Sequence, residues 1–342
     1  MKGMLHLIGT GGAGINATMS MVKDLKELGD KFSDIKASYL DTTDKTIKAY
    51  PSIKDEFIKI ESTKASGAKL DGMGGERANL EVAKEINTAV RTYVDKLPNE
   101  KNIYYVVIAS GSGASGSLIS PLLVRAMKEQ GFNVVMVLIG DSSNLLNLNN
   151  TINTIATLQH NCVRINNRAL SVIYYNNTVN RVTTPVTERS VNDKIFQILS
   201  ILSLYCSGNI QNIDHQDMNY FFEPSRYTSL DINPGLFNIG LAINKLVDEN
   251  TLLARTIVKE DTDDVQIEIP LRHNKMGVVT GELMDHYKDY PMFLLLRKNI
   301  MNMEMKHLKK ELEELEIYRQ TEYDEFDNID TSEVDDGLGL VV

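Results

Sequence analysis

The chain has few cysteines, no long apolar run and no excess of basic residues. Only two of its 342 residues are cysteines, Cys162 and Cys206, and neither belongs to a Cys-x-x-Cys or Cys/His spacing. A disulfide framework or a zinc site is therefore not expected. The apolar runs are far shorter than the roughly 20 residues that a membrane-spanning helix needs. We expect neither such a helix nor an export signal, and a reducing cytoplasm as the setting.

Acidic charge is concentrated in the C-terminal part of the chain. The net charge is −10, and from Glu304 onward four Lys or Arg stand against 13 Asp or Glu. The preceding residues are almost neutral and offer no basic face for a phosphate backbone, so we expect no direct binding of nucleic acid. Beyond Arg319 the sequence has eight acidic residues, no basic one and the ending Gly-Leu-Gly-Leu-Val-Val. This composition predicts a mobile acidic tail with an apolar tip.

The whole chain has 42% apolar and 24% charged residues, which is typical of a globular protein. Short apolar segments alternate with amphipathic ones over the first 150 residues, which predicts an α/β fold with βαβ units and a mostly parallel sheet. The predicted strands are residues 4–8, 35–40, 103–109, 134–139 and 170–175. The predicted helices are residues 14–28, 76–96 and 116–129.

The second half of the chain predicts a long helix followed by a smaller α+β domain. Apolar residues recur at helical spacing over residues 191–205, which indicates a buried helix. Strand-like segments follow within residues 224–298, at 251–258, 265–269, 277–279 and 292–296. Met301, Met305, Leu308, Leu312 and Leu315 then form an apolar stripe, which predicts an amphipathic helix over residues 298–319. Its simplest role is to pack on the chain's own body.

A first glycine-rich loop, Gly9-Thr10-Gly11-Gly12-Ala13-Gly14, lies between a predicted strand and a predicted helix. Glycines let a backbone approach phosphate closely, and the amides at a helix start donate to it. This spacing is also the dinucleotide fingerprint, and Asp41 follows the second strand where a ribose-binding acid would lie. An NAD-dependent dehydrogenase is therefore an alternative.

A second loop, Ser110-Gly111-Ser112-Gly113-Ala114-Ser115-Gly116-Ser117, follows another apolar strand, and Gly72-Met73-Gly74-Gly75 forms a third. A dinucleotide fold does not need a second glycine loop at a later strand end, whereas several such loops suit a nucleoside triphosphate. These loops lack the Gly-Lys-Ser/Thr of a P-loop. Phosphate charge must then be met by amides, helix dipoles and a bound cation.

An acidic motif, Asn212-x-Asp214-x-x-Asp217, follows the long helix. Two carboxylates three residues apart can share a helical face and polarise a water molecule. The motif alone is a weak signal, because acidic residues are also common as caps at helix starts.

Together these motifs resemble the tubulin and FtsZ superfamily of assembling GTPases over about residues 4–300. Residues 11–16, 41–44 and 72–75 are similar to its three phosphate loops, and residues 110–117 to its glycine-rich signature. The acidic motif behind a long helix is similar to its synergy loop. Ala114 and Ser117 stand where many relatives have glycine. Residues 140–150 lack the usual Glu and Arg, so no ribose contact carries over.

The resemblance implies a Rossmann-like GTPase domain that binds GTP or GDP, with Mg²⁺ on phosphate oxygens and water and no assigned protein ligand. It implies that Asn16, Asn192 and Asn177 read the guanine. The residues that it places around the nucleotide are Gly11, Gly12, Ala13, Asp41, Thr42, Gly74, Gly75, Gly113, Ala114, Ser115 and Gly116. Asp214 and Asp217 would act on the nucleotide of a neighbouring subunit in a head-to-tail filament.

Within the superfamily the sequence resembles the tubulins of large bacteriophages, the PhuZ group, through Ser115-Gly116-Ser117, Ser190-Val191-Asn192-Asp193 and the acidic tail. That resemblance implies filaments that position viral DNA or the phage nucleus and move capsids in the cytoplasm of an infected bacterial host. It also implies that the tail contacts a neighbouring subunit. A plasmid-segregation or cell-division homologue and a non-hydrolysing nucleotide-binding scaffold are further alternatives.

The expected organisation has five parts. They are a GTP-binding domain (1–189), a central helix with the synergy loop (190–223), an α+β activation domain (224–298), a C-terminal helix (299–320) and an acidic tail (321–342).

Overall fold

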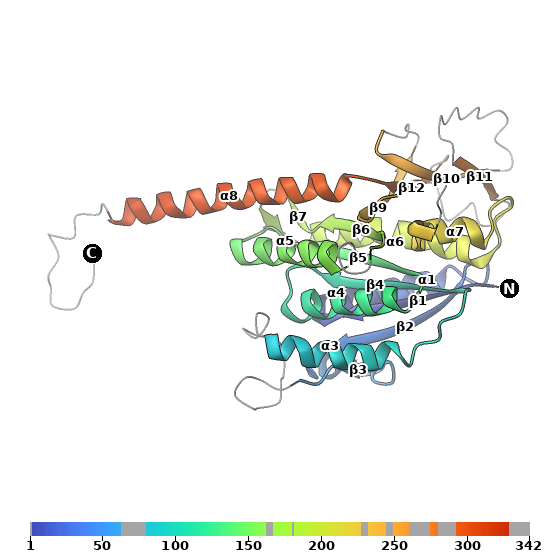
Figure 1. Ribbon diagram of the computed structural model, residues 1–342, viewed down its shortest axis with the longest axis horizontal. Coiled ribbons are helices and arrows are strands. Elements are labelled where there is room, and N and C mark those ends of the chain that lie inside the picture. Colours follow the sequence, from blue (N-terminus) through green and yellow to red (C-terminus); the bar gives the residue numbers. More distant parts are fainter. Residues whose placement is uncertain are drawn as a thin grey trace.

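The fold is built on one ten-stranded sheet with helices on both faces (Figure 1). The structure, a computed structural model, describes residues 2–62, 80–161, 167–179, 181–226, 232–243, 249–259, 274–279 and 292–327. The strand order is β11-β10-β12-β9-β6-β5-β4-β1-β2-β3. Among the described residues, no helix is both long and apolar enough to cross a bilayer.

The first seven strands of the sheet in chain order run parallel to one another. The strands in the middle of the sheet are almost wholly apolar and buried, as expected for parallel strands covered on both faces, whereas the first half of β2 and all of β3 are partly exposed. The bounds of these parallel strands are β1 (Met4–Thr10), β2 (Asp34–Asp41), β3 (Phe57–Lys59), β4 (Ile103–Ser110), β5 (Val134–Gly140), β6 (Leu170–Asn176) and β9 (Leu236–Ile243). Because parallel strands end at the same edge, the loops after β1, β2, β4 and β5 meet at one edge of the sheet.

The remaining strands extend the same sheet beyond β9. Strand β12 (Met292–Arg297) is antiparallel to β9, β10 (Thr251–Lys259) is antiparallel to β12, and β11 (Asn274–Val279) is parallel to β10. A separate hairpin of β7 (Thr178–Val179) and β8 (Val182–Thr183) follows β6. The strands within residues 224–298 therefore continue the N-terminal sheet through the pairing of β6 with β9.

The helices form two layers that cover the two faces of the sheet. One buried cluster contains side chains of α1 (Gly11–Glu27), α6 (Pro185–Ser207) and α7 (His215–Phe222). The other contains side chains of α3 (Leu80–Val94), α4 (Ala114–Glu129), α5 (Leu145–Gln159) and α8 (Ile300–Asp327). The short elements are α2 (Lys45–Ala49), η1 (Pro51–Ile53) and η4 (Pro224–Arg226).

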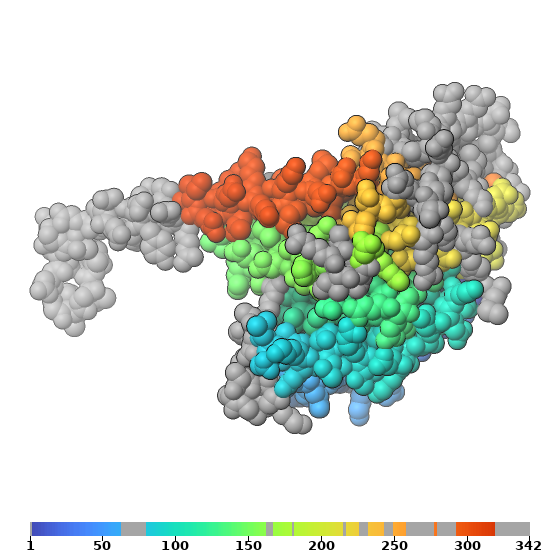
Figure 2. Space-filling view, in the orientation of Figure 1, coloured from blue at the N-terminus to red at the C-terminus, as the bar shows by residue number. Residues whose placement is uncertain are grey.

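Helix α8 lies along α5, and its end projects beyond the body of the molecule (Figures 1 and 2). Met301 and Leu308 are buried in the core, and Met305, Leu312 and Leu315 pack against it. The prediction that this apolar stripe packs on the chain's own body is thus confirmed.

Most predicted elements are present, with shifts of up to three residues at their ends, and two helices need correction. Helix α8 continues to Asp327, eight residues past its predicted end at 319 and into the segment predicted as tail. The long helix α6 begins at Pro185 and not at residue 191. Its first turn is mostly exposed, Val186 included, so it adds no buried apolar position to the periodic pattern. The start is set by Thr184, whose hydroxyl accepts from the amide of Thr187 in a capping box. The sequence pattern did not predict the strands β3 and β9, the β7–β8 hairpin or the helices α2, α5 and α7. The predicted strand at 265–269 and the first residues of the helix predicted at 76–96 lie outside the described residues.

Candidate functional site

The first glycine loop connects β1 to α1 and touches the second loop. Gly11 has φ +68°, a left-handed conformation that favours glycine. A Cβ placed there would lie 2.5 Å from the amide nitrogen of Gly116, and a Cβ on Gly116 would lie 2.7 Å from the carbonyl oxygen of Thr10. The two loops can therefore lie in backbone contact only because both positions are glycine.

The starts of α1 and α4 consequently lie side by side at the carboxyl edge of the sheet. The N-cap residues are Thr10 and Gly113, and neither makes a side-chain capping bond within the part of the chain that the structure describes. The first turns of both helices carry no acidic residue. Gly12 and Ala13 are exposed, and Gly113, Ala114 and Ser115 are half-buried. Two adjacent helix starts with accessible amides form a site for an anion such as phosphate.

The loop after β2 is tied to this anion site through Asp41 and Thr42. The carboxylate of Asp41 accepts from the amide of Thr42 at 2.7 Å and from the hydroxyl of Thr46 at 3.2 Å. Burial raises the pKa of Asp41, while hydrogen bonds from Thr42, Ser115 and Thr46 lower it and leave a net rise. The hydroxyls of Thr42 and Ser115 lie 2.9 Å apart. Because Asp41 is only 2% exposed and bonded to its own loop, its setting does not favour the ribose-binding acid of a dehydrogenase.

A polar network that the sequence analysis missed supports the second loop from the side of α5. The amide of Asn150 donates to the carbonyl of Ser112 at 3.0 Å, and the hydroxyl of Thr154 donates to the carbonyl of Gly111 at 2.9 Å. Asn144 caps α5 by accepting from the amide of Asn147. The available signal was the Ser/Asn-rich run over residues 142–150, which follows β5 at the same edge.

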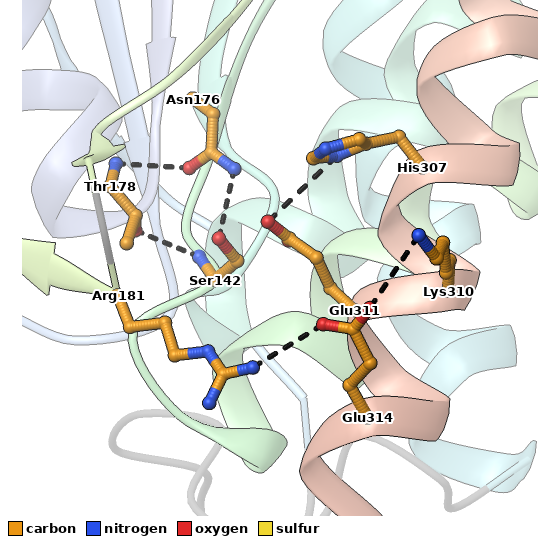
Figure 3. A network of polar contacts seen from close by, with 8 residues as sticks. All are labelled: Ser142, Asn176, Thr178, Arg181, His307, Lys310, Glu311 and Glu314. Carbon is orange, nitrogen blue, oxygen red and sulfur yellow. Dashed lines mark hydrogen bonds and ion pairs between the residues drawn. The ribbon is translucent and has the colours of Figure 1, made fainter.

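This network continues into the β7–β8 hairpin and approaches α8 (Figure 3). The amide of Ser142 donates to the hydroxyl of Thr178 at 2.9 Å, and the side-chain amide of Asn176 donates to the hydroxyl of Ser142 at 3.1 Å. At the hairpin turn, Arg181 forms an ion pair with Glu314 of α8 at 3.4 Å. Both side chains of that pair are half exposed, so it contributes little to stability.

The three asparagines expected to read the base lie on two sides of the site. Asn16 is exposed on α1, and Asn192 is half-buried on α6, which packs against α1. Asn177 follows β6, and its backbone amide donates to the carbonyl of Gly140 at 3.0 Å. The Oδ1 atom of Asn177 is buried without a hydrogen-bond partner among the described residues. Gly74 and Gly75 lie outside the described residues.

Asp214 and Asp217 lie at the opposite edge of the sheet from the glycine loops. The end of α6 meets the start of β1, where the amide of Gly3 donates to the carbonyl of Cys206 at 2.9 Å. Helix α6 has 23 residues and so spans about 34 Å at roughly 1.5 Å per residue. Helix α7 packs against α6, and Figure 1 shows it at the same end of the molecule as the N-terminus. The acidic pair is therefore too distant to reach the anion site of its own chain.

The two acids differ in their surroundings. The carboxylate of Asp217 accepts from the backbone amide of Asp214 at 3.0 Å, and the carboxylate of Asp214 accepts from the backbone amide of Asp217 at 3.1 Å. These two bonds form a reciprocal cap at the start of α7. Asp217 is 6% exposed, and its carboxylate also accepts from Nη2 of Arg255 on β10 at 2.9 Å. Asp214 is exposed. The two acids therefore do cap the start of α7, as the capping interpretation of the motif predicts, and Asp214 remains exposed to solvent.

Metal binding by side chains alone finds no support within the described ranges. No group of three or more His, Cys, Asp or Glu residues there could hold an ion. Asp41, which ends β2 at the same edge as the anion site, is buried and bonded to its own loop. These residues fit a cation that is held mainly by phosphate oxygens and water.

The fold and the site define a class of nucleotide-binding α/β proteins whose phosphate loops and acidic loop lie at opposite ends of one subunit. Residues 5–175, half of the chain, match the Tubulin/FtsZ family, GTPase domain. The chain belongs to this family, and its N-terminal half is the family's GTPase domain. This confirms the α/β fold class and the resemblance inferred from the loops, and it favours the assembling GTPase over the dehydrogenase.

Several of the individual proteins that the chain is similar to are phage tubulins. The chain is 26% identical over 213 residues to a phage tubulin-like protein of Pseudomonas phage 201phi2-1. That match covers 62% of this chain and 59% of the relative, so the chain spans about three-fifths of the relative's length. Two solved structures share its fold. The monomeric subunit of TubZ from bacteriophage PhiKZ has a TM-score of 0.72 at 19% identity, with 92% of this chain and 98% of that chain covered. The PhuZ201 filament has a TM-score of 0.70 at 19% identity, with 93% and 92% covered.

Proposed function

We propose that this chain binds GTP at the carboxyl edge of its sheet and hydrolyses it when a second copy docks head to tail and presents Asp214. The observation that carries the proposal is the separation of the two halves of the site across one subunit. An exposed carboxylate that cannot reach its own anion site can reach that of a neighbour in a head-to-tail polymer. Such an association is heterologous and open, and it generates filaments.

The chain's own residues would perform distinct tasks in this reaction. The amides at the starts of α1 and α4 bind the phosphates, and Asp41 and Thr42 hold the neighbouring loop against Ser115. Magnesium, carried on the phosphates, would supply charge neutralisation. Asp214 of the next subunit would orient the attacking water, and Asp217 would position Asp214 through the reciprocal cap. Phosphate release would then weaken the subunit interface.

Recognition of guanine is assigned to Asn16, Asn192 and Asn177. Side-chain amides can both donate to and accept from the base edge, and the Oδ1 atom of Asn177 has no partner among the described residues. In this scheme residues 1–189 would serve as the GTP-binding domain, 190–223 as the central helix with the acidic loop, and 224–298 as the activation domain. Helix α8 (Ile300–Asp327) would be the C-terminal helix, and the acidic sequence after it the tail.

The cellular role that fits these assignments is that of a phage-encoded filament in the cytoplasm of an infected bacterium. A similar chain is described as a filament, PhuZ201, and the relative from phage 201phi2-1 is described as tubulin-like. The filament would position viral DNA or the phage nucleus and move capsids. The acidic tail would contact a neighbouring subunit.

Light scattering tests the proposal directly. Purified protein with Mg²⁺ is given GTP, ATP or NAD at equal concentration, and assembly is followed over time. GTP alone is expected to raise the scattering. Assembly with NAD, or equal assembly with ATP, would contradict the assigned nucleotide.

A further inference from the structure

A buried ion pair connects the end of α4 to the end of α7. Lys128, in the last turn of α4, donates to Oε2 of Glu223 at 2.9 Å and to the carbonyl of Phe222 at 2.9 Å. The side chains of Lys128 and Glu223 are 0% and 1% exposed. On the other side, Arg168 donates to the carbonyl of Lys128 at 2.8 Å. The lysine therefore binds both the carboxylate that follows α7 and the last carbonyl of that helix.

Stability alone does not account for such a pair. Removing two charges from water is costly, and replacing a buried pair by well-packed apolar residues is often neutral or stabilising. An apolar replacement would lack the directional hydrogen bonds of the ion pair. The pair fixes the distance and the orientation between two helix ends, and the lysine also satisfies a terminal carbonyl that has no partner within its own helix.

The two helices joined by this pair carry the two halves of the proposed site. Helix α4 begins at Ala114, in the anion site, and extends about 24 Å at roughly 1.5 Å per residue before it ends beside Glu223. Helix α7 begins directly after Asp214, has only eight residues and ends at Phe222. A shift at the end of α7 therefore moves Asp214 with it, since a single short helix connects them.

We infer that Lys128 and Glu223 form a positioning pair, which fixes α7 to α4 and so sets how Asp214 is presented to the next subunit. This inference rests on the proposed function. Neither residue touches nucleotide. The other end of α7 is held by Arg255 through Asp217, so the helix is anchored at both ends by buried ion pairs.

The test replaces the pair by apolar side chains of similar size, Lys128→Met combined with Glu223→Leu. Circular dichroism establishes folding, GTP affinity is measured on dilute protein, and turnover is expressed per polymerised subunit after sedimentation. The matched control is Glu129→Gln, one residue along α4. Glu129 forms more exposed ion pairs with Arg91 of α3 and Arg125 of α4.

The expected result is unchanged GTP affinity and turnover lowered by about tenfold or more, because a misplacement of about 1 Å can lower a rate by about a hundredfold. The control should keep the turnover of the wild type. A folded double variant that assembles and turns over GTP at the wild-type rate would overturn the inference. If the double variant does not fold, Glu223→Asp shortens the carboxylate by one methylene, and wild-type turnover in its filaments would overturn the inference equally.

Asp214→Asn separates the two proposals. If that variant loses turnover while the double variant keeps it, only the positioning pair is wrong. If that variant hydrolyses GTP like the wild type, the proposed function itself is wrong.

Discussion

Asp217 and Arg255 form a buried ion pair at 2.9 Å between the acidic loop and strand β10. The guanidinium of Arg255 also lies 5.4 Å from the centre of the Tyr220 ring, on the same short helix as Asp217. An acid that is buried and held in this way is suited to positioning its neighbour. The exposed Asp214 is the better placed of the two to meet a second subunit.

Arg255→Met is expected to lower the free energy of unfolding by about 3–5 kcal/mol, because it leaves the Asp217 carboxylate buried beside an apolar chain. Adding Asp217→Asn should recover much of that loss, since an amide costs less to bury than a charge. Urea unfolding of the two variants and the wild type measures both changes. If the single and the double variant lost the same free energy of unfolding, the unpaired Asp217 carboxylate would not be the cause of the loss.

Gly11→Ala is expected to destabilise the protein and to abolish GTP binding. Its Cβ would meet the amide nitrogen of Gly116 at 2.5 Å, and the left-handed backbone adds about 1–2 kcal/mol for a residue with a side chain. Gly12→Ala is the matched comparison, because its Cβ would have its nearest neighbour, Thr46, at 4.0 Å. Thermal unfolding should distinguish the two variants clearly. Similar melting temperatures would contradict the close contact of the two loops.

His6 should make stability depend on pH below neutrality. Burial, reinforced by the charge of Lys36, lowers the pKa of His6 to about 4, and its Nε2 lies 2.9 Å from the hydroxyl of Ser38. The unfolded chain binds a proton near pH 6.5 and the folded chain only near pH 4, so stability falls as the pH drops through that window. Between pH 7 and pH 5 the loss is about 2 kcal/mol, at about 1.4 kcal/mol per pKa unit.

His6→Gln is the comparison for this prediction, measured by urea unfolding at both pH values. The glutamine variant should lose less stability than the wild type between pH 7 and pH 5. An identical loss in both proteins would assign the pH dependence to other groups.

Deleting residues 324–342 is expected to raise the protein concentration needed for assembly. The deleted segment is acidic with an apolar tip, and we propose that it binds a neighbouring subunit. Sedimentation at a series of protein concentrations gives the critical value for each chain. Assembly of the truncated chain at the same concentration as the full chain would exclude the contact.

Much of the N-terminal sheet and of the phosphate loops was predictable from the sequence. Strands such as β1 and β4 are continuous apolar runs that end in glycine-rich loops. This pattern lies within one short stretch of sequence, so it can be recognised without knowing any long-range contact. Helix α5 was missed although Leu148, Ile152 and Ile155 have helical spacing, because the intervening asparagines and threonines obscured it. Strand β9 was missed because Asn238 and Gly240 interrupt its apolar pattern.

The contacts that define the acidic loop could not be predicted, because they join distant parts of the chain. Arg255 lies 38 residues after Asp217, and Lys128 lies 95 residues before Glu223. No local pattern identifies such partners. The sequence alone does not distinguish the roles of the two acids. In the structure, burial and the ion pair with Arg255 distinguish Asp217 from the exposed Asp214.

The most direct test of the account is GTP turnover measured across the critical concentration for assembly, for the wild type and Asp214→Asn. Turnover of the wild type should be close to zero below that concentration and should rise in proportion to the sedimented polymer above it. Asp214→Asn should still sediment, with turnover lower by about a hundredfold or more. Asp34→Asn is the control, since Asp34 is an exposed acid at the same edge of the sheet. Turnover proportional to total protein from the lowest concentrations, with no break at assembly, would contradict a site completed by two subunits.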